Sequence, residues 1–174
     1  IAAARAAGIE MDAITRALSG FEMSFESLPG RLNLHDNGRF RILMDYAHNA
    51  DGIRQLVKFT DQLPGKGRKI FAFGVSPDAV ASAVFEAAAA AAGHFDHYVC
   101  VGKPEAGPSG LTHPEILKHG LMANNVPQDR IATFTNPDDS FDCAVGLCEA
   151  GDLLVIVSSR VAFARNWQKI LATH

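Results

Sequence analysis

The sequence predicts an α/β fold with a mostly parallel, open sheet, helices on both faces and a β-hairpin at its N-terminal edge. Short apolar runs alternate with helical patterns from residue 38 to the end of the chain. The later runs, such as RKIFAFG and DLLVIVSS, are apolar throughout, which is typical of parallel strands buried on both faces. Between RLNLH and RFRILMD, Asn37-Gly38 has the turn chemistry of a hairpin, because both residues tolerate a positive φ.

The first 28 residues form a separate unit in this prediction. An Ala-rich helical segment ends at Gly8, and Asp12 can cap a second helix whose apolar residues recur at helical spacing. Pro29 and Gly30 then interrupt the pattern. We therefore expect one unit to end at residue 28 and a single α/β domain to span 29–174.

Helices are predicted after each later strand. The first follows Asn49, buries one face that includes Ile53 and Leu56, and ends before Pro64. The second is predicted to begin at Ser76 as its N-cap. The next two have Thr112 and Asn136 as N-caps, and a last helix follows DLLVIVSS.

Composition narrows the classes of partner. The chain has 174 residues, 48% of them hydrophobic, which suits one domain with a sizeable core. A net charge of −3 provides no basic field for nucleic acid or an acidic membrane, and no stretch approaches the ~20 apolar residues of a membrane helix. Cys100, Cys143 and Cys148 lie in apolar contexts, which favours reduced thiols in a cytoplasmic protein. No metal site is predicted, and a homo-oligomer is left open.

The stretch ILMDYAHNADGI places polar side chains where a buried strand meets a helix. Asp45 ends the strand and Asn49 lies at the helix N-cap. Because ligands of open α/β sheets bind at the carboxyl ends of strands, and a helix N-terminus favours phosphate, Asp45 could accept hydrogen bonds from a ribose and His48 could donate to a phosphate. The alternative is purely structural: Asn49 caps the helix, Asp45 braces the turn and His48 is a satisfied polar side chain.

Together, LPGRLNL and DYAHN resemble the C-terminal domain of the Mur ligase superfamily, and within it the Mur-ligase-like part of cyanophycin synthetase. This resemblance implies a Rossmann-like domain of an ATP-dependent ligase that joins amino acids through acyl-phosphates. The segment AAARAAGIEMDAITRALSGF resembles the last helices of the family's central ATPase domain. Since the chain begins at Ile1 rather than Met, we expect a fragment of a longer polypeptide.

The resemblance also implies residue roles. Arg31 corresponds to an arginine that reaches the nucleotide when the two domains close, and Asp45 to an acid that contacts the ribose. Tyr46, His48 and Asn49 correspond to the loop that packs around the nucleotide. The P-loop lysine and the Mg²⁺ ligands of such ligases belong to the central domain, and the chain contains no G-x-x-x-x-G-K-[ST] motif. We therefore expect no catalytic residue in this chain and no ligation by it alone, although ATP and an amino-acid or peptide substrate would be its ligands.

Two segments depart from the family pattern. Relatives carry Gly-Asp-Arg after the next strand, whereas FGVSPDAVAS keeps Gly74 and Asp78 but has no arginine. The segment VGKPEAGPSGLTH also lacks arginine, and Lys103 is its only cation before the histidine. Arginine binds a carboxylate bidentately, whereas lysine acts as a point charge. Lys103 and Arg160, which follows the last strand, are therefore weaker candidates for substrate binding.

Three hypotheses follow from the sequence. The first is the C-terminal domain of an ATP-dependent amide-bond-forming ligase, which closes over the nucleotide and helps to seat the incoming amino acid. The second is a degenerate, non-catalytic nucleotide- or ligand-binding module of the same fold, suggested by the missing arginine. The third, from another class, is an independent doubly wound enzyme with His48 as general base and Asp45 nearby.

Overall fold

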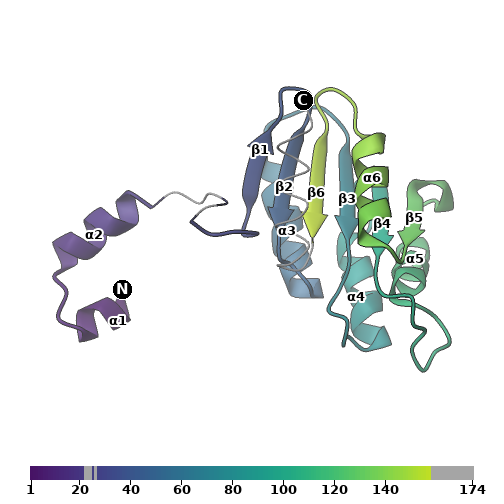
Figure 1. The fold of residues 1–174 in the computed structure, drawn as a ribbon, viewed down its shortest axis with the longest axis horizontal. Helices are drawn as coiled ribbons and strands as arrows, with labels where there is room; N and C mark the ends of the chain where they lie inside the picture. Colours follow the sequence, from purple (N-terminus) through teal and green to yellow (C-terminus); the bar gives the residue numbers. More distant parts are fainter. Residues whose placement is uncertain (22–24, 26, 158–174) are drawn as a thin grey trace.

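A six-stranded, mostly parallel sheet forms the body of the protein. The computed structural model describes residues 1–21, 25 and 27–157. The strands follow the spatial order β1-β2-β6-β3-β4-β5 (Figure 1). Only β1 is antiparallel to its neighbour among these strands, which confirms the predicted sheet with a hairpin at one edge. The bounds are Asn33–Asp36 for β1, Arg41–Asp45 for β2, Lys69–Phe73 for β3, His97–Val101 for β4, Ile131–Phe134 for β5 and Leu153–Val157 for β6.

Helices cover both faces of this sheet, as predicted. On one face α3 (Ala50–Gln62), α4 (Ala81–Ala91) and α5 (His113–Ala123) pack side by side, while α6 (Pro137–Leu147) lies on the other face over β3, β4 and β5 (Figure 1). The chain steps outward from β3 to β5 and then returns through α6 to β6 in the centre. Because parallel crossovers are right-handed, this reversal of direction places α6 on the opposite face.

Two apolar clusters lie on either side of the sheet. Alternate residues of β6 contribute to each, with Val155 in the cluster below α3, α4 and α5 and Leu154 in the cluster below α6. All five residues of β6 are buried. A central strand that is covered on both faces needs apolar side chains at every position, which explains the uninterrupted apolar run.

Side chains at the element ends largely match the predicted turn and cap residues. The Asn49 side chain accepts from the backbone N–H of Gly52 and begins α3, while Thr112 and Glu115 form a capping box at α5. In the hairpin, Gly38 has a φ of 83°, and Asn37 contributes through its side-chain oxygen, which accepts from the N–H groups of the next two non-glycine residues.

Two predicted helix starts are wrong. The N-cap of α2 (Met11–Ser19) is Glu10, and Asp12 lies in the first turn of the helix rather than at its cap. α4 begins at Ala81 rather than after Ser76, and Val80 precedes it in an extended conformation. The carbonyl of Ser76 instead accepts from the N–H of Ala79 at 3.0 Å and closes a turn. The segment that follows β3 is therefore a loop over the carboxyl edge of the sheet.

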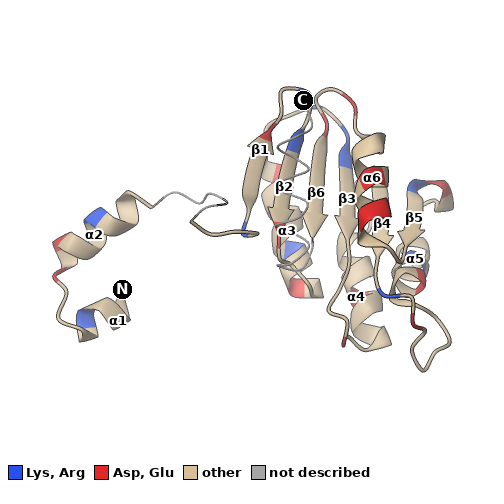
Figure 2. Cartoon of the chain, viewed as in Figure 1, with Lys and Arg blue, Asp and Glu red and all other residues tan. Residues whose placement is uncertain are grey.

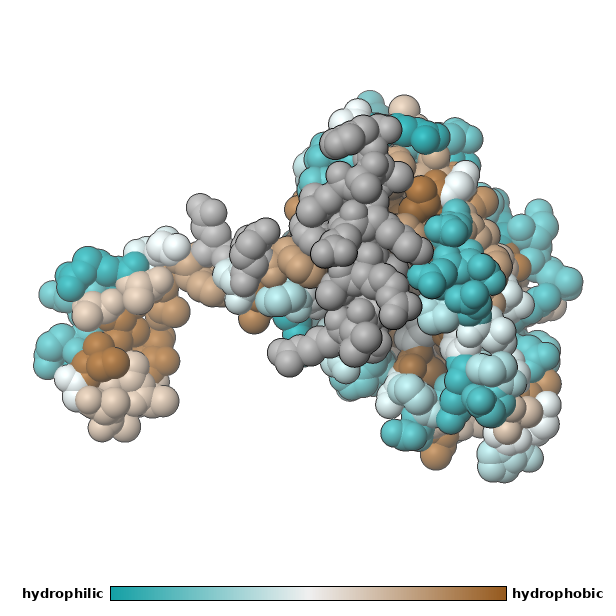
Figure 3. Space-filling model, in the orientation of Figure 1, coloured by the Kyte–Doolittle hydropathy of each residue, from teal (hydrophilic) through white to brown (hydrophobic). Residues whose placement is uncertain are grey.

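Two short helices precede the sheet. α1 (Ala2–Ala6) and α2 (Met11–Ser19) lie apart from it (Figure 1). Apolar side chains gather on this pair (Figure 3). The side chains of Met11 and Leu18 in α2, and of Phe21 just after it, are exposed. None of the helices in the described ranges has the length and hydrophobicity to cross a membrane.

Charged residues of both signs are distributed over the described elements (Figure 2). The acidic residues on α6 are the most visible group in this view, and Asp138 and Asp139 lie in its first turn. Negative charge at a helix N-terminus is stabilising because it interacts with the positive end of the helix dipole. The interaction with the helix dipole therefore explains the position of Asp138 and Asp139 without a ligand.

Candidate functional site

A pocket of about 300 Å³ opens beside the carboxyl end of β2. It is lined by every residue for which the sequence predicted nucleotide binding, namely Arg31, Asp45, Tyr46, His48 and Asn49. The structure thus brings together two segments that are separated by the whole hairpin. Side chains of α3 that the sequence did not single out complete the wall, among them Gln55 and Phe59. Gln55 and Phe59 lie one helical turn apart on α3, which places them on the same face of this helix.

Asp45 braces the floor of this pocket. One of its carboxylate oxygens accepts from the N–H of Leu32 at 3.1 Å, and the other accepts from the N–H of Ala47 at 2.9 Å. Leu32 has a φ of 49°, a conformation that costs energy for any residue with a Cβ. Asp45 therefore stabilises the backbone at Leu32 and Ala47, as the structural alternative predicted. Each oxygen keeps a further lone pair, so the geometry also permits a hydrogen bond to a ligand hydroxyl.

Asn33 holds the loop that carries Arg31. Its side chain is buried, and its oxygen accepts from the N–H of Gly30 at 2.6 Å. Its amide nitrogen donates to the carbonyls of Leu28 and Arg31, at 3.2 and 3.3 Å. Sequence reasoning did not assign a role to Asn33, although it belongs to the LPGRLNL motif on which the resemblance rests.

An aromatic pair lies beneath the arginine. The guanidinium carbon of Arg31 is 5.0 Å from the centroid of the Tyr46 ring, a cation–π arrangement. The Tyr46 and His48 rings have centroids 5.3 Å apart. Arg31 thus lies over the ring of Tyr46, the residue that directly follows β2. It lines the same pocket as Asp45 and Asn49.

The contacts of His48 indicate which ring nitrogen carries the hydrogen. Its Nδ1 lies 3.0 Å from the carbonyl oxygen of Tyr46. Because a carbonyl only accepts, Nδ1 carries the hydrogen, and a neutral ring keeps its lone pair on Nε2. Both oxygens of Asp45 bind backbone N–H groups instead. In the described structure His48 and Asp45 thus contact backbone groups rather than each other, and an independent enzyme with His48 as general base stays a prediction.

The N-terminus of α3 forms another wall. Asn49 accepts from the Gly52 N–H at 2.8 Å, and Gly52 itself lines the pocket. A Cβ at Gly52 would lie 3.2 Å from the Asn49 Oδ1 and 3.3 Å from the Ala47 Cβ. The space at Gly52 is therefore tight, and its N–H already donates to the Asn49 side chain.

A wider cleft of about 510 Å³ adjoins this pocket along the carboxyl edge of the sheet. The last residues of β4 and β6 and the segments that follow β2, β3 and β5 contribute to its lining, and Tyr46 and His48 are shared by both cavities. The loops after β3 and β4 contribute Gly74 and Lys103. Asp78, the remnant of the family's Gly-Asp-Arg segment, is exposed and does not line this cleft. The other predicted substrate residue, Arg160, lies outside the described residues.

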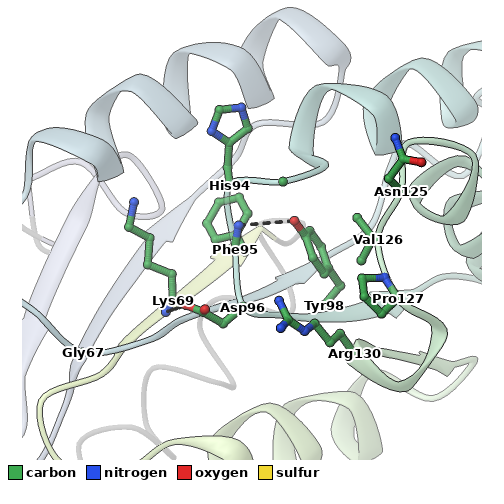
Figure 4. Close-up of a pocket in the computed structure, with 11 residues that line it drawn as sticks. Gly67, Lys69, His94, Phe95, Asp96, Tyr98, Asn125, Val126, Pro127 and Arg130 are labelled. Carbon is green, nitrogen blue, oxygen red and sulfur yellow. Dashed lines mark hydrogen bonds between the residues drawn. The ribbon is translucent and has the colours of Figure 1, made fainter.

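A third cavity of about 280 Å³ lies at the opposite, amino edge of the sheet (Figure 4). Four of its polar side chains, those of Lys69, His94, Asp96 and Tyr98, already have partners. Lys69 and His94 both pair with Asp61, and Asp96 accepts from the Lys69 N–H at 2.8 Å. The hydroxyl of Tyr98 donates to a carbonyl of α4 and accepts from the Phe95 N–H, which is drawn as a dashed line in Figure 4. Burial raises the pKa of this hydroxyl.

Metal-binding and thiol chemistry find little support in the described part of the chain. Within it no three His, Cys, Asp or Glu side chains are grouped so that they could hold a metal ion. Cys100 and Cys148 are buried and Cys143 is partly buried, all three as free thiols. Burial raises the pKa of Cys148 to about 12, so its thiol is protonated at neutral pH and is a poor nucleophile.

Comparisons with known proteins agree with this geometry. Cyanophycin synthetase from Synechocystis sp. is 30% identical over 119 residues, which cover 68% of this chain but 13% of that protein. Among solved structures, MurF from Acinetobacter baumannii has a TM-score of 0.71 at 17% identity, over 98% of this chain and 35% of MurF. Escherichia coli FolC in complex with ADP has a TM-score of 0.61 at 25% identity, over 92% of this chain and 38% of FolC.

The Synechocystis relative is a synthetase by name, and the chain spans a small part of the length of all three proteins. The model of the Mur ligase, glutamate ligase domain family matches residues 30–160. That match begins at the loop of Arg31 and runs through the central strand β6. The chain therefore belongs to the Mur ligase C-terminal, or glutamate ligase, domain family.

Proposed function

We propose that the chain is the nucleotide-closing domain of an ATP-dependent, amide-bond-forming ligase similar to cyanophycin synthetase. The observation that supports this most directly is the pocket that unites Arg31, Asp45, Tyr46, His48 and Asn49 at the carboxyl end of β2. A structural neighbour that covers the same fold, FolC, was solved with ADP. A cytoplasmic location, where ATP is available, is part of the proposal.

In the proposed reaction, the γ-phosphoryl group of ATP is transferred to a carboxylate, which gives an acyl-phosphate and ADP. The nitrogen of an amine then attacks the acyl carbon. The C–N bond forms, the bond from carbon to the phosphate oxygen breaks, and inorganic phosphate leaves while the nitrogen releases a proton. Residues 1–28 are proposed to be the tail of the preceding ATPase domain, which would supply the P-loop and the Mg²⁺ ligands.

This chain's own residues contribute by positioning and by electrostatics. Arg31 offers a planar, permanently charged donor group suited to phosphate. The N-terminus of α3, capped by Asn49, offers a second site for negative charge, and Asp45 offers acceptors for a ribose hydroxyl. Closure over the nucleotide would exclude water from the acyl-phosphate and orient the amine.

A second candidate keeps the nucleotide pocket but lacks ligation. Its support is the loop after β3, where the family's arginine is missing and Asp78 is exposed. In that case the natural polypeptide would bind ADP or ATP without consuming ATP in the presence of any amino acid or dipeptide.

The test is calorimetric titration of the natural polypeptide with ADP. We expect Arg31→Gln to weaken ADP binding by about tenfold or more, because a hydrogen bond to a charged group contributes about 1.5–3 kcal/mol. Arg39 provides a matched control. It lies over the ring of Phe40, with 5.9 Å from guanidinium carbon to centroid, at the amino end of β2.

Arg39→Gln should therefore leave ADP affinity unchanged. Equal affinity of wild type and Arg31→Gln, or equal losses in both variants, would contradict the placement of the nucleotide. Turnover of ATP with amino acids then separates the two candidates, because only a ligase releases phosphate in proportion to amide formed.

A further inference from the structure

We propose that the cleft at the carboxyl edge binds the incoming amine and that this amine is an amino acid with an apolar side chain and a single carboxylate. This inference rests on the proposed function and names the substrate class of that site. Three properties of the described lining support it: its apolar surface, its single cation and its continuity with the nucleotide pocket.

The apolar surface comes from neighbouring strands and from the loops around them. Val157 ends β6, Val101 ends β4 and Val75 follows β3 between them. Three prolines complete this part of the lining, two from the loops that follow β3 and β4 and one from the first position of α6. An apolar side chain placed here leaves water for an apolar surface, which is favourable. The apolar residues of this lining are Val75, Pro77, Val101, Pro104, Pro137 and Val157.

The charge balance of the lining is also specific. Lys103 is the single Lys or Arg among the described residues that line the cleft, and neither Asp nor Glu is present among them. Lys103 also forms no ion pair with the rest of the described chain. One ammonium group can pair with one carboxylate. Among the described lining residues, the second carboxylate of an acidic amino acid would meet no further Lys or Arg, and the side chain of a basic one would meet no Asp or Glu. Neither side chain would therefore gain from these residues the ion pairing that offsets the cost of desolvation.

Size and position fit the same class. The cleft has a volume of about 510 Å³, within the ~300–1,000 Å³ that is usual for small-molecule sites. It has room for an amino acid and for the activated end of the acceptor. Tyr46 and His48 line both this cleft and the nucleotide pocket, so an amine held here lies next to the place where the acyl-phosphate forms.

The experiment titrates the natural polypeptide, saturated with ADP, with four probes: leucine, aspartate, arginine and 3-methylbutylamine, which is leucine without its carboxylate. We expect leucine to bind at least about tenfold more tightly than the other three. In Lys103→Gln, leucine binding should weaken to the level of 3-methylbutylamine, whereas the affinities for 3-methylbutylamine and ADP should not change.

Lys58→Gln is the matched control, because Lys58 is exposed on α3 and lines neither cavity. It should bind all four probes as the wild type does. Tightest binding of aspartate or arginine, failure of all four to bind, or an equal effect of both lysine variants would overturn the inference while ADP binding still supports the proposed function. Loss of ADP binding in the wild type would instead refute the proposed function itself.

Discussion

At the scale of single residues, Asn33 decides where Arg31 can lie. Its buried amide makes hydrogen bonds with three backbone groups of the preceding loop. The next constraint along the chain is Leu32, whose positive φ is held by Asp45. Arg31 thus lies between two fixed points, and its guanidinium is held over Tyr46 without any direct hydrogen bond to that side chain. A strained residue beside a pocket often indicates that geometry is being maintained for a ligand.

This arrangement predicts the effect of replacing Asn33. Asn33→Leu leaves the Gly30 N–H and two carbonyls without partners, so we expect the free energy of unfolding to fall by about 1–3 kcal/mol. We also expect ADP affinity to fall, because the loop no longer directs Arg31. Asn33→Asp keeps the acceptor for Gly30 and should bind ADP with intermediate affinity. Urea denaturation and calorimetry measure the two quantities separately.

Asn37 is the control for this experiment. It also accepts two backbone hydrogen bonds, but in the hairpin turn at the far end of β1. Asn37→Ala should lower stability and leave ADP affinity as in the wild type. If both asparagine variants lost ADP affinity in proportion to their loss of stability, Asn33 would have only a structural role.

At the scale of elements, most boundaries followed from local chemistry. Asn49, Thr112 and Asn136 were expected to begin helices from their side chains alone, and they do. Ser76 failed because Ser-Pro at a strand end can equally close a turn, and only the packing of α4 decides between the two. α4 is rich in alanine, and the sequence alone did not show which neighbouring helix this helix would contact.

The partner of that Ala-rich helix is α5, and the contact depends on one glycine. A Cβ at Gly120 would lie 2.6 Å from the Cβ of Ala88 and 3.2 Å from the Phe85 carbonyl oxygen. Gly120→Ala should therefore push α4 and α5 apart and lower the free energy of unfolding by about 1–3 kcal/mol. Thermal or urea denaturation checks this.

Gly146 makes the comparison specific. It also lies within a helix, α6, and a Cβ there would meet no atom of the described residues within 4 Å. Gly146→Ala should raise stability by up to about 1 kcal/mol, since alanine is the better helix former. Two alanine substitutions in helices are thus expected to act in opposite directions. A stabilising Gly120→Ala would show that the helices can separate without cost.

At the scale of the whole molecule, the sequence predicted the class of fold and the composition of the nucleotide pocket but not the arrangement of the sheet. The position of β6 between β2 and β3 depends on pairing between distant segments, for which a single sequence has no local signal. The apolar cleft was missed for the same reason, since its residues follow different strands. Arg31 and Asp45 were placed together through the motif resemblance, whereas spacing alone left Asp45 as either a brace or a ligand contact.

One buried carboxylate, that of Asp152, connects segments of the chain that are far apart in the sequence. Asp152, just before β6, accepts from the N–H of Arg68, from the Arg68 guanidinium and from the Glu149 N–H, at 2.8, 2.7 and 2.8 Å. It therefore ties the start of the central strand to the segment that enters β3. Burial alone would raise the pKa of Asp152, but these hydrogen bonds, with that from Arg68 the largest, outweigh it and hold the pKa below its ordinary value.

A lowered pKa in the folded state means that the unfolded chain takes up the proton first. The stabilisation by Asp152 is therefore complete above the ordinary carboxyl pKa of about 4 and is lost as the pH falls through the lower, folded value. We expect Asp152→Asn to reduce the free energy of unfolding by about 1–3 kcal/mol at pH 7. The difference from wild type should shrink at pH 3, because the Asp152 carboxyl of the unfolded wild-type chain is then largely protonated, which favours unfolding. Glu149→Gln is the control. The Glu149 side chain is 76% exposed, and its carboxylate lies 3.4 Å from the Arg68 guanidinium. Because exposed ion pairs contribute about 0–1 kcal/mol, this substitution should change the free energy of unfolding little. Urea denaturation of the wild type and both variants at pH 7 and pH 3 measures these free energies. If the difference between wild type and Asp152→Asn stays constant or grows at pH 3, the carboxylate charge of Asp152 does not stabilise the connection between β6 and β3.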